Sequence, residues 1–218
     1  MRKIEIIFGI IAFLGVLMKL FHYPGGSLFL IFALGIITNF LFYFGFALFN
    51  RIRFRDIFKN SSYKDASAKK IIGAIGLGWG LSMIVLGGLF KLVLYPNPDK
   101  MLLVGLLYTG VILIVAIVYY LRNKSDYYKR IFKRIAIYGI FGLVLYLIPT
   151  TTFLNIYFAK NPEYSEHPEF AELFQKVLAE PENFQKYSGQ LEQLRMELEW
   201  EKIQKWQQEK DKENNRSR

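Results

Sequence analysis

Long apolar stretches alternate with short polar connections over the first 158 residues of the chain. Each stretch has about the 20 residues that a helix needs to cross a bilayer core of about 30 Å. The stretches are Ile4–Phe21, Leu28–Phe49, Ile71–Phe90, Met101–Leu121 and Ile135–Phe158. They lack the alternating polarity of a transmembrane barrel, and peptide groups in lipid need partners within the chain. The pattern therefore predicts an all-α, polytopic helical membrane protein.

A ten-residue motif ends the first apolar stretch and recurs at the end of the third. Gly15–Pro24 and Gly87–Pro96 match at six of ten positions, at a constant offset of 72 residues. Two unrelated decapeptides would share about one position, so the match indicates an internal repeat. In each copy an apolar run ends, the chain turns at a proline and another apolar run begins. The sequence therefore predicts two tandem transmembrane hairpins, at residues 1–50 and 71–121.

The remaining segments are defined by their charge. They are a basic connection at residues 51–70, a basic loop at 122–134, a fifth transmembrane span at 135–158 and a polar tail at 159–218. Residues 1–158 hold 18 Lys and Arg against 5 Asp and Glu, whereas the tail holds 10 against 13. Short connections that are rich in Lys and Arg usually lie on the cytoplasmic side of the membrane. We therefore expect an inner-membrane protein with a cytoplasmic N-terminus and, after five crossings, a periplasmic tail.

The tail has the pattern of two helices. Pro168 suits the first turn of a short amphipathic helix, and Pro181 separates that helix from a longer one. The longer helix is expected from Gly189 to about Lys210, with Ser188 as its cap and a disordered end after it. Its apolar stripes do not extend over enough heptads to establish a coiled coil. We expect a helical hairpin, or a helix that lies on a partner or on the membrane.

Composition supports a membrane protein and excludes several other classes. Of the 218 residues, 53% are hydrophobic and 17% aromatic, which is unusual for a soluble domain. The net charge of +10 does not indicate nucleic-acid binding, because the cations lie in the connections between apolar stretches. The chain has no cysteine, so disulfides and thiolate metal sites are excluded. No catalytic motif is present, and we expect no enzyme activity, cofactor or metal site.

Two lysines of the repeated motif are the main candidates for polar chemistry within the membrane. Lys19 and Lys91 each lie five residues before the turn proline, in the last turn of a helix. A cation there complements the free carbonyls of the helix end and can extend to the lipid head groups. The alternative is that both face the bundle interior, where each would need a carboxylate partner. His22 has Leu94 as its counterpart, and a lone histidine lacks the ligand set of a metal site.

Other residues of the repeat are expected to form the turns and to pack helices together. A tyrosine before a turn proline suits the aromatic belt at the membrane interface, and glycines allow a tight turn. These turn residues are Tyr23, Pro24, Gly25, Gly26, Tyr95 and Pro96. In the third stretch Gly76 and Gly80 form a small-x-x-x-small pair, which allows two helices to approach closely. Pro149 should kink the fifth stretch.

The first copy of the motif, Leu17–Gly26, resembles the first hairpin of the GldL gliding-motility family of Bacteroidota. In that family the first helix ends in a Phe-Lys-x-x-His-x-Pro-Gly kind of sequence. The second copy is similar more weakly, through Lys91 and the Tyr-Pro pair that follows it. The resemblance implies an inner-membrane subunit that pairs with a single-span periplasmic subunit, in a proton-driven motor linked to type IX secretion. It places Lys19 and His22 at the family's polar positions.

The chain departs from the family in two respects. Leu28–Phe49 contains no carboxylate, whereas the family's motor subunits carry one in the second helix, and five apolar stretches are present rather than two. We therefore expect a non-catalytic assembly or scaffold component of an envelope complex. Its partners would be the lipid bilayer, further copies or another membrane protein, and a periplasmic protein bound by the tail. The alternative is an ion-coupled motor or transport subunit that uses Lys19, His22 and Lys91.

Overall fold

The computed structural model describes residues 2–216 except 22, 24, 65–66 and 161–166. Within these residues the regular structure consists of eight α-helices and three short 3-10 helices. The prediction of an all-α chain is therefore confirmed. The chain divides into two compact units, Met1–Leu154 and Asn155–Arg218, which are described separately.

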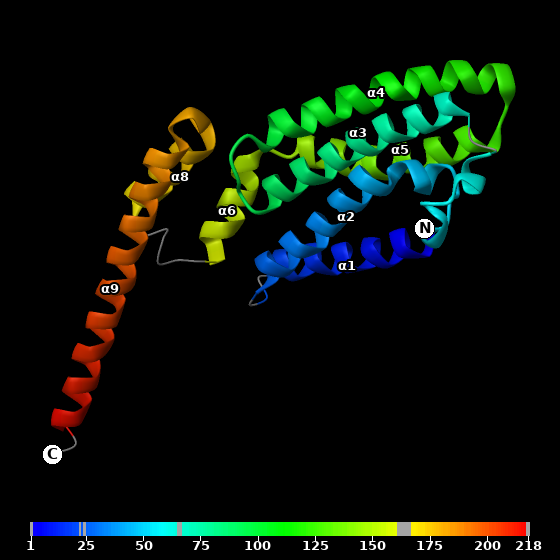
Figure 1. Ribbon diagram of the computed structural model, residues 1–218. Helices are drawn as coiled ribbons and strands as arrows, with labels where there is room; N and C mark the ends of the chain where they lie inside the picture. The colour runs from blue at the N-terminus through cyan, green and yellow to red at the C-terminus, as the bar shows by residue number, and fades with distance from the viewer. Residues whose placement is uncertain (1, 22, 24, 65–66, 161–166, 217–218) are drawn as a thin grey trace. The chain divides into compact units, whose positions relative to one another are not determined.

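The first unit is a bundle of long helices (Figure 1). They are α1 (Arg2–Leu20), α2 (Gly26–Phe49), α3 (Ala68–Leu92), α4 (Pro98–Asn123) and α5 (Asp126–Leu147). The connection between α2 and α3 contains two 3-10 helices, η1 (Phe54–Asp56) and η2 (Asn60–Tyr63), and α6 (Thr150–Lys160) follows α5. Short turns join α1 to α2 and α3 to α4, as the two expected hairpins require.

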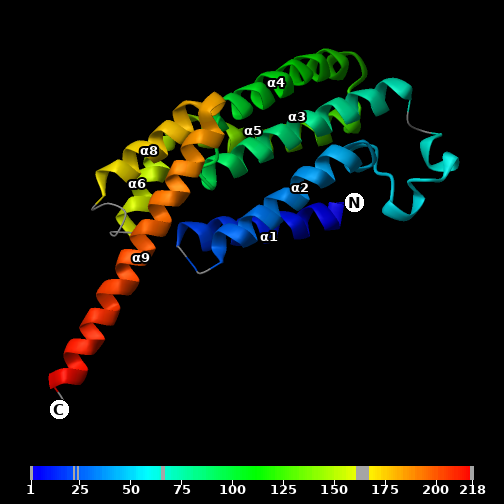
Figure 2. The same ribbon diagram turned by 60° about the vertical axis from the view of Figure 1, so that its left-hand side comes forward.

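α3 is the central helix of this bundle. It packs against α2, α4 and α5, and Figure 2 shows α3 between α2 and α4. In its most apolar stretch 56% of the residues are buried, against 39% in α2 and 22% in α4. Leu77, Leu81 and Ile84 of α3 are completely buried. α4 therefore lies at the edge of the bundle and leaves a large apolar surface uncovered.

Glycines bring α2 and α3 so close that no side chain fits between them. A Cβ atom on Gly78 would lie 2.5 Å from the carbonyl oxygen of Leu41, and one on Gly45 would lie 2.9 Å from Cα of Gly78. Such distances are far below normal van der Waals contact. Gly45 and Gly78 are therefore required for this helix contact, and neither belongs to the small-x-x-x-small pair expected from the sequence.

Three helices, α2, α3 and α4, are long and apolar enough to cross a membrane, and α5 with α6 would make a fourth if this bent pair is one span. The expected number of five is therefore not reached. The first apolar stretch falls short because Arg2, Lys3, Glu5 and Lys19 lie within α1. The kink expected at Pro149 is a bend of 75° between α5 and α6.

The basic loop expected at residues 122–134 is mostly helical. α4 continues to Asn123 and α5 begins at Asp126, so that only Lys124 and Ser125 lie between them. The buried residues Tyr127, Ile131 and Ile135 explain the difference, because they continue an apolar stripe at helical spacing through the charged segment. The cations of this segment consequently project from α5 rather than from a loop.

The second unit contains α8 (Pro168–Ala179), the 3-10 helix η3 (Pro181–Asn183) and α9 (Phe184–Arg216). Pro168 lies in the first turn of α8, and η3 separates the two helices, as the prolines predict. α8 packs against α9 and buries Phe170 and Val177.

Both expected limits of the longer tail helix are wrong. α9 begins before Ser188, whose hydroxyl donates a hydrogen bond to the carbonyl oxygen of Gln185 inside the helix. It continues to Arg216 instead of ending near Lys210. Within this polar helix Glu192 and Arg195 form an i,i+3 ion pair.

Candidate functional site

The buried charge of the second hairpin is the starting point for a functional site. Lys91, in the last turn of α3, has no solvent-exposed surface. Its Nζ donates a hydrogen bond to Oδ1 of Asp99 in the first turn of α4, at 2.5 Å. The other carboxylate oxygen, Oδ2, accepts a hydrogen bond of 3.1 Å from Oγ1 of Thr150 at the start of α6. Asp99 therefore connects α3, α4 and α6 at this end of the bundle.

The turn between α3 and α4 places these two charges together. The backbone N–H of Tyr95 donates to the carbonyl oxygen of Phe90, and this bond closes the C-terminal end of α3. Asn97 then adopts a left-handed conformation, with φ of 57°, just before α4 begins. The turn puts Lys91 at the negative end of one helix dipole and Asp99 at the positive end of the next. Each charge is thus favoured by its own helix as well as by its partner.

The first hairpin has the same turn, with a neutral partner for its lysine. The N–H of Tyr23 donates to the carbonyl oxygen of Met18 at 2.8 Å, which matches the bond from Tyr95. Gly25 has a positive φ of 77°, as Asn97 does at the equivalent position. Nζ of Lys19 donates to Oγ of Ser27 at 2.8 Å, and Ser27 lies 72 residues before Asp99. The repeat therefore includes a lysine bond across each turn.

The structure pairs Lys91 with Asp99, a carboxylate just beyond the turn. The repeat itself contained the signal, because an alignment at the offset of 72 pairs Ser27 with Asp99, eight residues after each lysine. Lys19 is half-buried, whereas Lys91 is enclosed. His22 and Pro24 lie outside the described residues.

The remaining turn residues take different positions. Tyr23 and Tyr95 are 65% and 46% exposed, and the ring of Tyr95 packs on Phe90 with 4.5 Å between centroids. Pro96 is buried. Gly26 begins α2 against the end of α1, where an added Cβ would lie 2.8 Å from the carbonyl oxygen of Met18. A side chain at Gly26 would therefore force the first hairpin apart.

Gly76 and Gly80 face α4, as a small-x-x-x-small pair on α3 would. An added Cβ on Gly76 would lie 3.1 Å from the hydroxyl of Tyr108, and one on Gly80 would lie 2.6 Å from Oγ1 of Thr109. Their neighbours are thus side chains, which can shift. Oγ1 of Thr109 is buried and has no hydrogen-bond partner within the described part of the chain.

An ion pair between α1 and α5 was not foreseen from the sequence. Arg134 donates from Nε to Oε1 of Glu5 at 2.8 Å and from Nη2 to Oε2 at 2.7 Å. The two side chains are only 11% and 15% exposed, and the guanidinium lies 5.3 Å from the centre of the Phe49 ring. This bidentate pair neutralises the carboxylate of α1 and connects the first helix to the last helix of the bundle.

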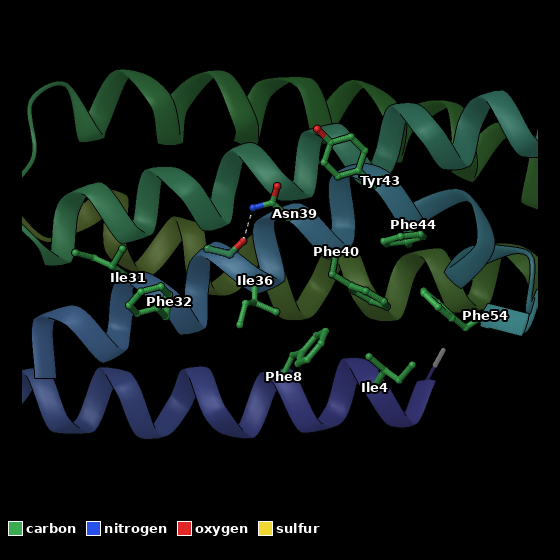
Figure 3. Close-up of a pocket in the computed structure, with 11 residues that line it drawn as sticks. Ile4, Phe8, Ile31, Phe32, Ile36, Asn39, Phe40, Tyr43, Phe44 and Phe54 are labelled. Atoms are coloured by element: carbon green, nitrogen blue, oxygen red, sulfur yellow. Dashed lines mark hydrogen bonds between the residues drawn. The ribbon is translucent and has the colours of Figure 1, made fainter. Parts of the chain in front are cut away.

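An apolar groove lies along α1 and α2 (Figure 3). It has a volume of about 600 Å³, and Ile4 and Phe8 of α1 face Ile36 and Phe40 of α2 across it. Asn39 contributes a polar amide to the lining of this groove. Its Nδ2 donates a hydrogen bond to the carbonyl oxygen of Gly35 at 2.9 Å. The amide is therefore satisfied within its own helix, which suits an apolar surrounding.

Within the described residues, no three histidine, aspartate or glutamate side chains lie close enough together to hold a metal ion. Comparisons with protein-family models, curated proteins and solved structures find no match for this chain.

Proposed function

We propose that the chain is a non-catalytic, multi-pass inner-membrane protein that holds together an envelope complex, and that its repeated hairpin is related to that of the GldL family. In this proposal the complex serves gliding motility or type IX secretion. The bundle anchors the protein, and the tail binds a protein partner. The observation that carries the proposal is the combination of a lipid-compatible bundle with an exposed apolar stripe on a long polar helix.

The outer surface of α4 supports a lipid environment. Leu107, Val111, Ile114 and Leu121 are each more than 60% exposed, at 63%, 61%, 64% and 70%. Soluble proteins rarely leave an apolar surface of this extent in contact with water. In a bilayer the same side chains would contact lipid tails, so that no apolar surface would be exposed to water.

The first hairpin supports a fifth crossing by α1. A Cβ atom added to Gly15 would lie 3.3 Å from Cα of Leu30 in the first hairpin. One added to Gly87 would lie 2.8 Å from the backbone nitrogen of Leu102 in the second. These positions differ by 72 residues, so α1 packs on α2 as α3 packs on α4. α1 has 19 residues and is thus about 28 Å long. Because Glu5 is paired with Arg134, its charge is not an obstacle to crossing.

In this arrangement the cations of the α2–α3 connection and of the α5 start face the cytoplasm. An odd number of crossings then places the tail in the periplasm. A periplasmic tail can reach a partner that is anchored elsewhere in the envelope, which is the role we propose for it.

The tail presents a surface for such a partner. Met196, Trp200 and Ile203 of α9 are 56%, 62% and 46% exposed and follow one another at helical spacing. α9 has 33 residues and α8 has 12, so most of α9 extends beyond the helix that packs on it. A large aromatic side chain in an exposed stripe is typical of the centre of a protein interface. We propose that this stripe binds an amphipathic helix of the partner.

Affinity purification of the full-length protein in mild detergent tests this role. The double variant Met196→Gln and Trp200→Gln should lose a specific co-purifying protein, because both apolar anchors are removed while the helix is retained. The matched control, Gln193→Ala with Glu197→Gln, changes exposed polar positions of the same helix and should keep it. Equal retention by both double variants would show that the stripe is not the binding surface.

The buried Lys91–Asp99 pair favours a second candidate, an ion-coupled subunit that uses Lys19, His22 and Lys91. In that function the pair would exchange a proton or ion during turnover. The variants Lys19→Met and Lys91→Met separate the candidates. A complex that still assembles but loses ion-dependent movement would contradict a pure scaffold, whereas a complex that works normally would exclude ion coupling through these lysines.

A further inference from the structure

A polar cavity lies at the basic end of the first unit. It has a volume of about 490 Å³, and its lining comes from the end of α2, the segment around η1, the start of α3 and the start of α5. Four of the lining side chains are cationic: Arg51, Arg53, Lys70 and Arg130. Because these residues come from three separate parts of the sequence, the fold gathers charges that repel one another. Such an arrangement favours an anionic ligand between them.

The two carboxylates of the cavity have lysine partners of their own. Nζ of Lys59 lies 2.8 Å from Oδ1 of Asp56, and Nζ of Lys129 lies 3.1 Å from Oδ1 of Asp126. Neither lysine belongs to the lining. Among the described residues, the four cations of the lining have no carboxylate within ion-pair distance. The four cations of the lining therefore outnumber its two carboxylates, and the cavity keeps an excess of positive charge for a ligand.

Arg130 supplies a buried donor without an acceptor. Its Nε is inaccessible to solvent and has no hydrogen-bond partner in the described part of the chain. The guanidinium lies 5.9 Å from the centre of the Tyr127 ring, and the Tyr127 hydroxyl donates to the carbonyl oxygen of Lys70 at 2.8 Å. The ring thus holds Arg130 beside the start of α3. A buried donor of this kind is costly unless an acceptor is supplied.

Arg51 occupies a backbone position that usually belongs to glycine. Its φ is 60°, in the left-handed region, and it follows Asn50, which caps α2. The N–H of Ile52 donates to the carbonyl oxygen of Ala47 at 2.9 Å, which closes the helix end around this residue. Glycine would adopt this conformation without strain. The strained arginine instead brings a guanidinium to the cavity.

We propose that this cavity binds a phosphate oxyanion, supplied either by the head group of an anionic lipid or by a free phosphate. Guanidinium groups match phosphate oxygens in charge and in geometry, and Arg51, Arg53 and Arg130 bring three of them to the cavity. The cavity lies where the apolar helix α2 ends and α3 begins, which is the level of lipid head groups if these helices cross a bilayer. Only the lipid source depends on the proposed membrane location.

Thermal unfolding of the purified full-length protein in an uncharged detergent tests this site. The protein is titrated with dioleoylphosphatidylglycerol, with dioleoylphosphatidylcholine and with inorganic phosphate at constant ionic strength. An occupied site raises the unfolding midpoint in proportion to ligand affinity. In the double variant Arg51→Asn with Arg53→Gln, the half-saturating concentration should rise about tenfold or more, since charge-assisted bonds are lost. Both side chains are exposed, so folding should be preserved.

The control is the double variant Arg122→Gln with Lys133→Gln, which removes the same charge from exposed positions outside the lining. This control should show the same half-saturating concentration of anionic ligand as the unmodified protein. Stabilisation by phosphatidylglycerol alone identifies the lipid source, and stabilisation by inorganic phosphate identifies a free phosphate site. Equal weakening in both double variants, or no anion effect in the unmodified protein, overturns the proposal. Because no cell-based assembly is measured, failure here is distinct from failure of the scaffold function.

Discussion

Burial decides what each lysine of the repeat contributes. Lys91 is fully buried, whereas its partner Asp99 is 48% exposed at the side chain. A buried cation without a carboxylate is strongly destabilising, but a half-exposed carboxylate can be hydrated when its cation is removed. Lys19 donates to the neutral hydroxyl of Ser27, and such a bond contributes about 1 kcal/mol. The two copies of one motif are therefore expected to respond differently to the same substitution.

This asymmetry predicts an order of stabilities. Asp99→Asn should lower the free energy of unfolding by about 3 kcal/mol, because the Lys91 charge stays buried without an anion. Lys91→Met should cost about 1 kcal/mol, since methionine fills the space without charge. The double variant should be more stable than Asp99→Asn alone. Unfolding by denaturing detergent gives the three values, and Ser27→Ala in the first hairpin is the control. Equal losses for Asp99→Asn and Lys91→Met would contradict the argument.

Glu180 in the tail should be sensitive to acid. Hydrogen bonds from Asn183 and Tyr187 hold the pKa of the Glu180 carboxyl below its ordinary value. A carboxyl whose pKa is lowered by folding contributes stability above its unfolded pKa, and this contribution is lost as the pH falls through the folded pKa. An NMR titration of the full-length protein should give a Glu180 midpoint below that of an unfolded peptide. Tyr187→Phe and Asn183→Ala should each raise it, and an unchanged midpoint would show that the bonds do not act on this carboxyl.

At the scale of whole elements, sequence pattern was informative where the helices are uniformly apolar. The stretch Leu28–Phe49 nearly coincides with α2, Gly26–Phe49. The pattern failed at α5, where charged residues conceal a buried stripe that begins at Tyr127, and at α9, which continues to Arg216. The high charge of residues 122–134 predicts a loop, but a half-covered helix tolerates charge on its exposed side.

Helix contacts were harder to predict than the helices themselves. The pair Gly76 and Gly80 is visible as a spacing within one helix, but spacing does not identify the helix opposite. Gly45 and Gly78 meet across α2 and α3, and their importance follows only from the distance between the two backbones. The same holds for Glu5 and Arg134, which are 129 residues apart in sequence and form one ion pair.

The contact between α2 and α3 predicts a graded effect of glycine substitutions. Gly78→Ala should destabilise the bundle by about 1–3 kcal/mol, because the methyl group would lie 2.5 Å from a backbone oxygen that cannot move independently. Gly76→Ala should cost less, since its nearest neighbour is a side-chain hydroxyl. Gly73→Ala on the same helix has open space and should be neutral or slightly stabilising. Thermal unfolding in detergent measures all three, and equal effects would show that the close approach is unimportant.

At the scale of the whole molecule, the number of crossings decides which parts of the chain share a compartment. Three or four helices are apolar enough to cross, and α1 adds a further crossing if its paired charge is tolerated. The tail and the basic α2–α3 connection are separated by α3, α4 and the bent α5–α6 pair, so they lie on opposite sides if this pair crosses and on the same side if it does not. The proposed scaffold function needs the tail outside the cytoplasm, whereas the proposed phosphate site needs only an anion at the basic end of the bundle.

The absence of cysteine from the sequence makes this question accessible, because each introduced cysteine is the unique thiol of the chain. Gln193→Cys marks α9 and Ser61→Cys marks the α2–α3 connection, and both positions are exposed. In intact spheroplasts a membrane-impermeant maleimide should label the first but not the second, and permeabilisation should expose both. If the bent α5–α6 pair does not cross the membrane, only α3 and α4 lie between the two positions, and both cysteines would react only after permeabilisation. That result would place the tail in the cytoplasm, and a periplasmic partner would then be out of its reach.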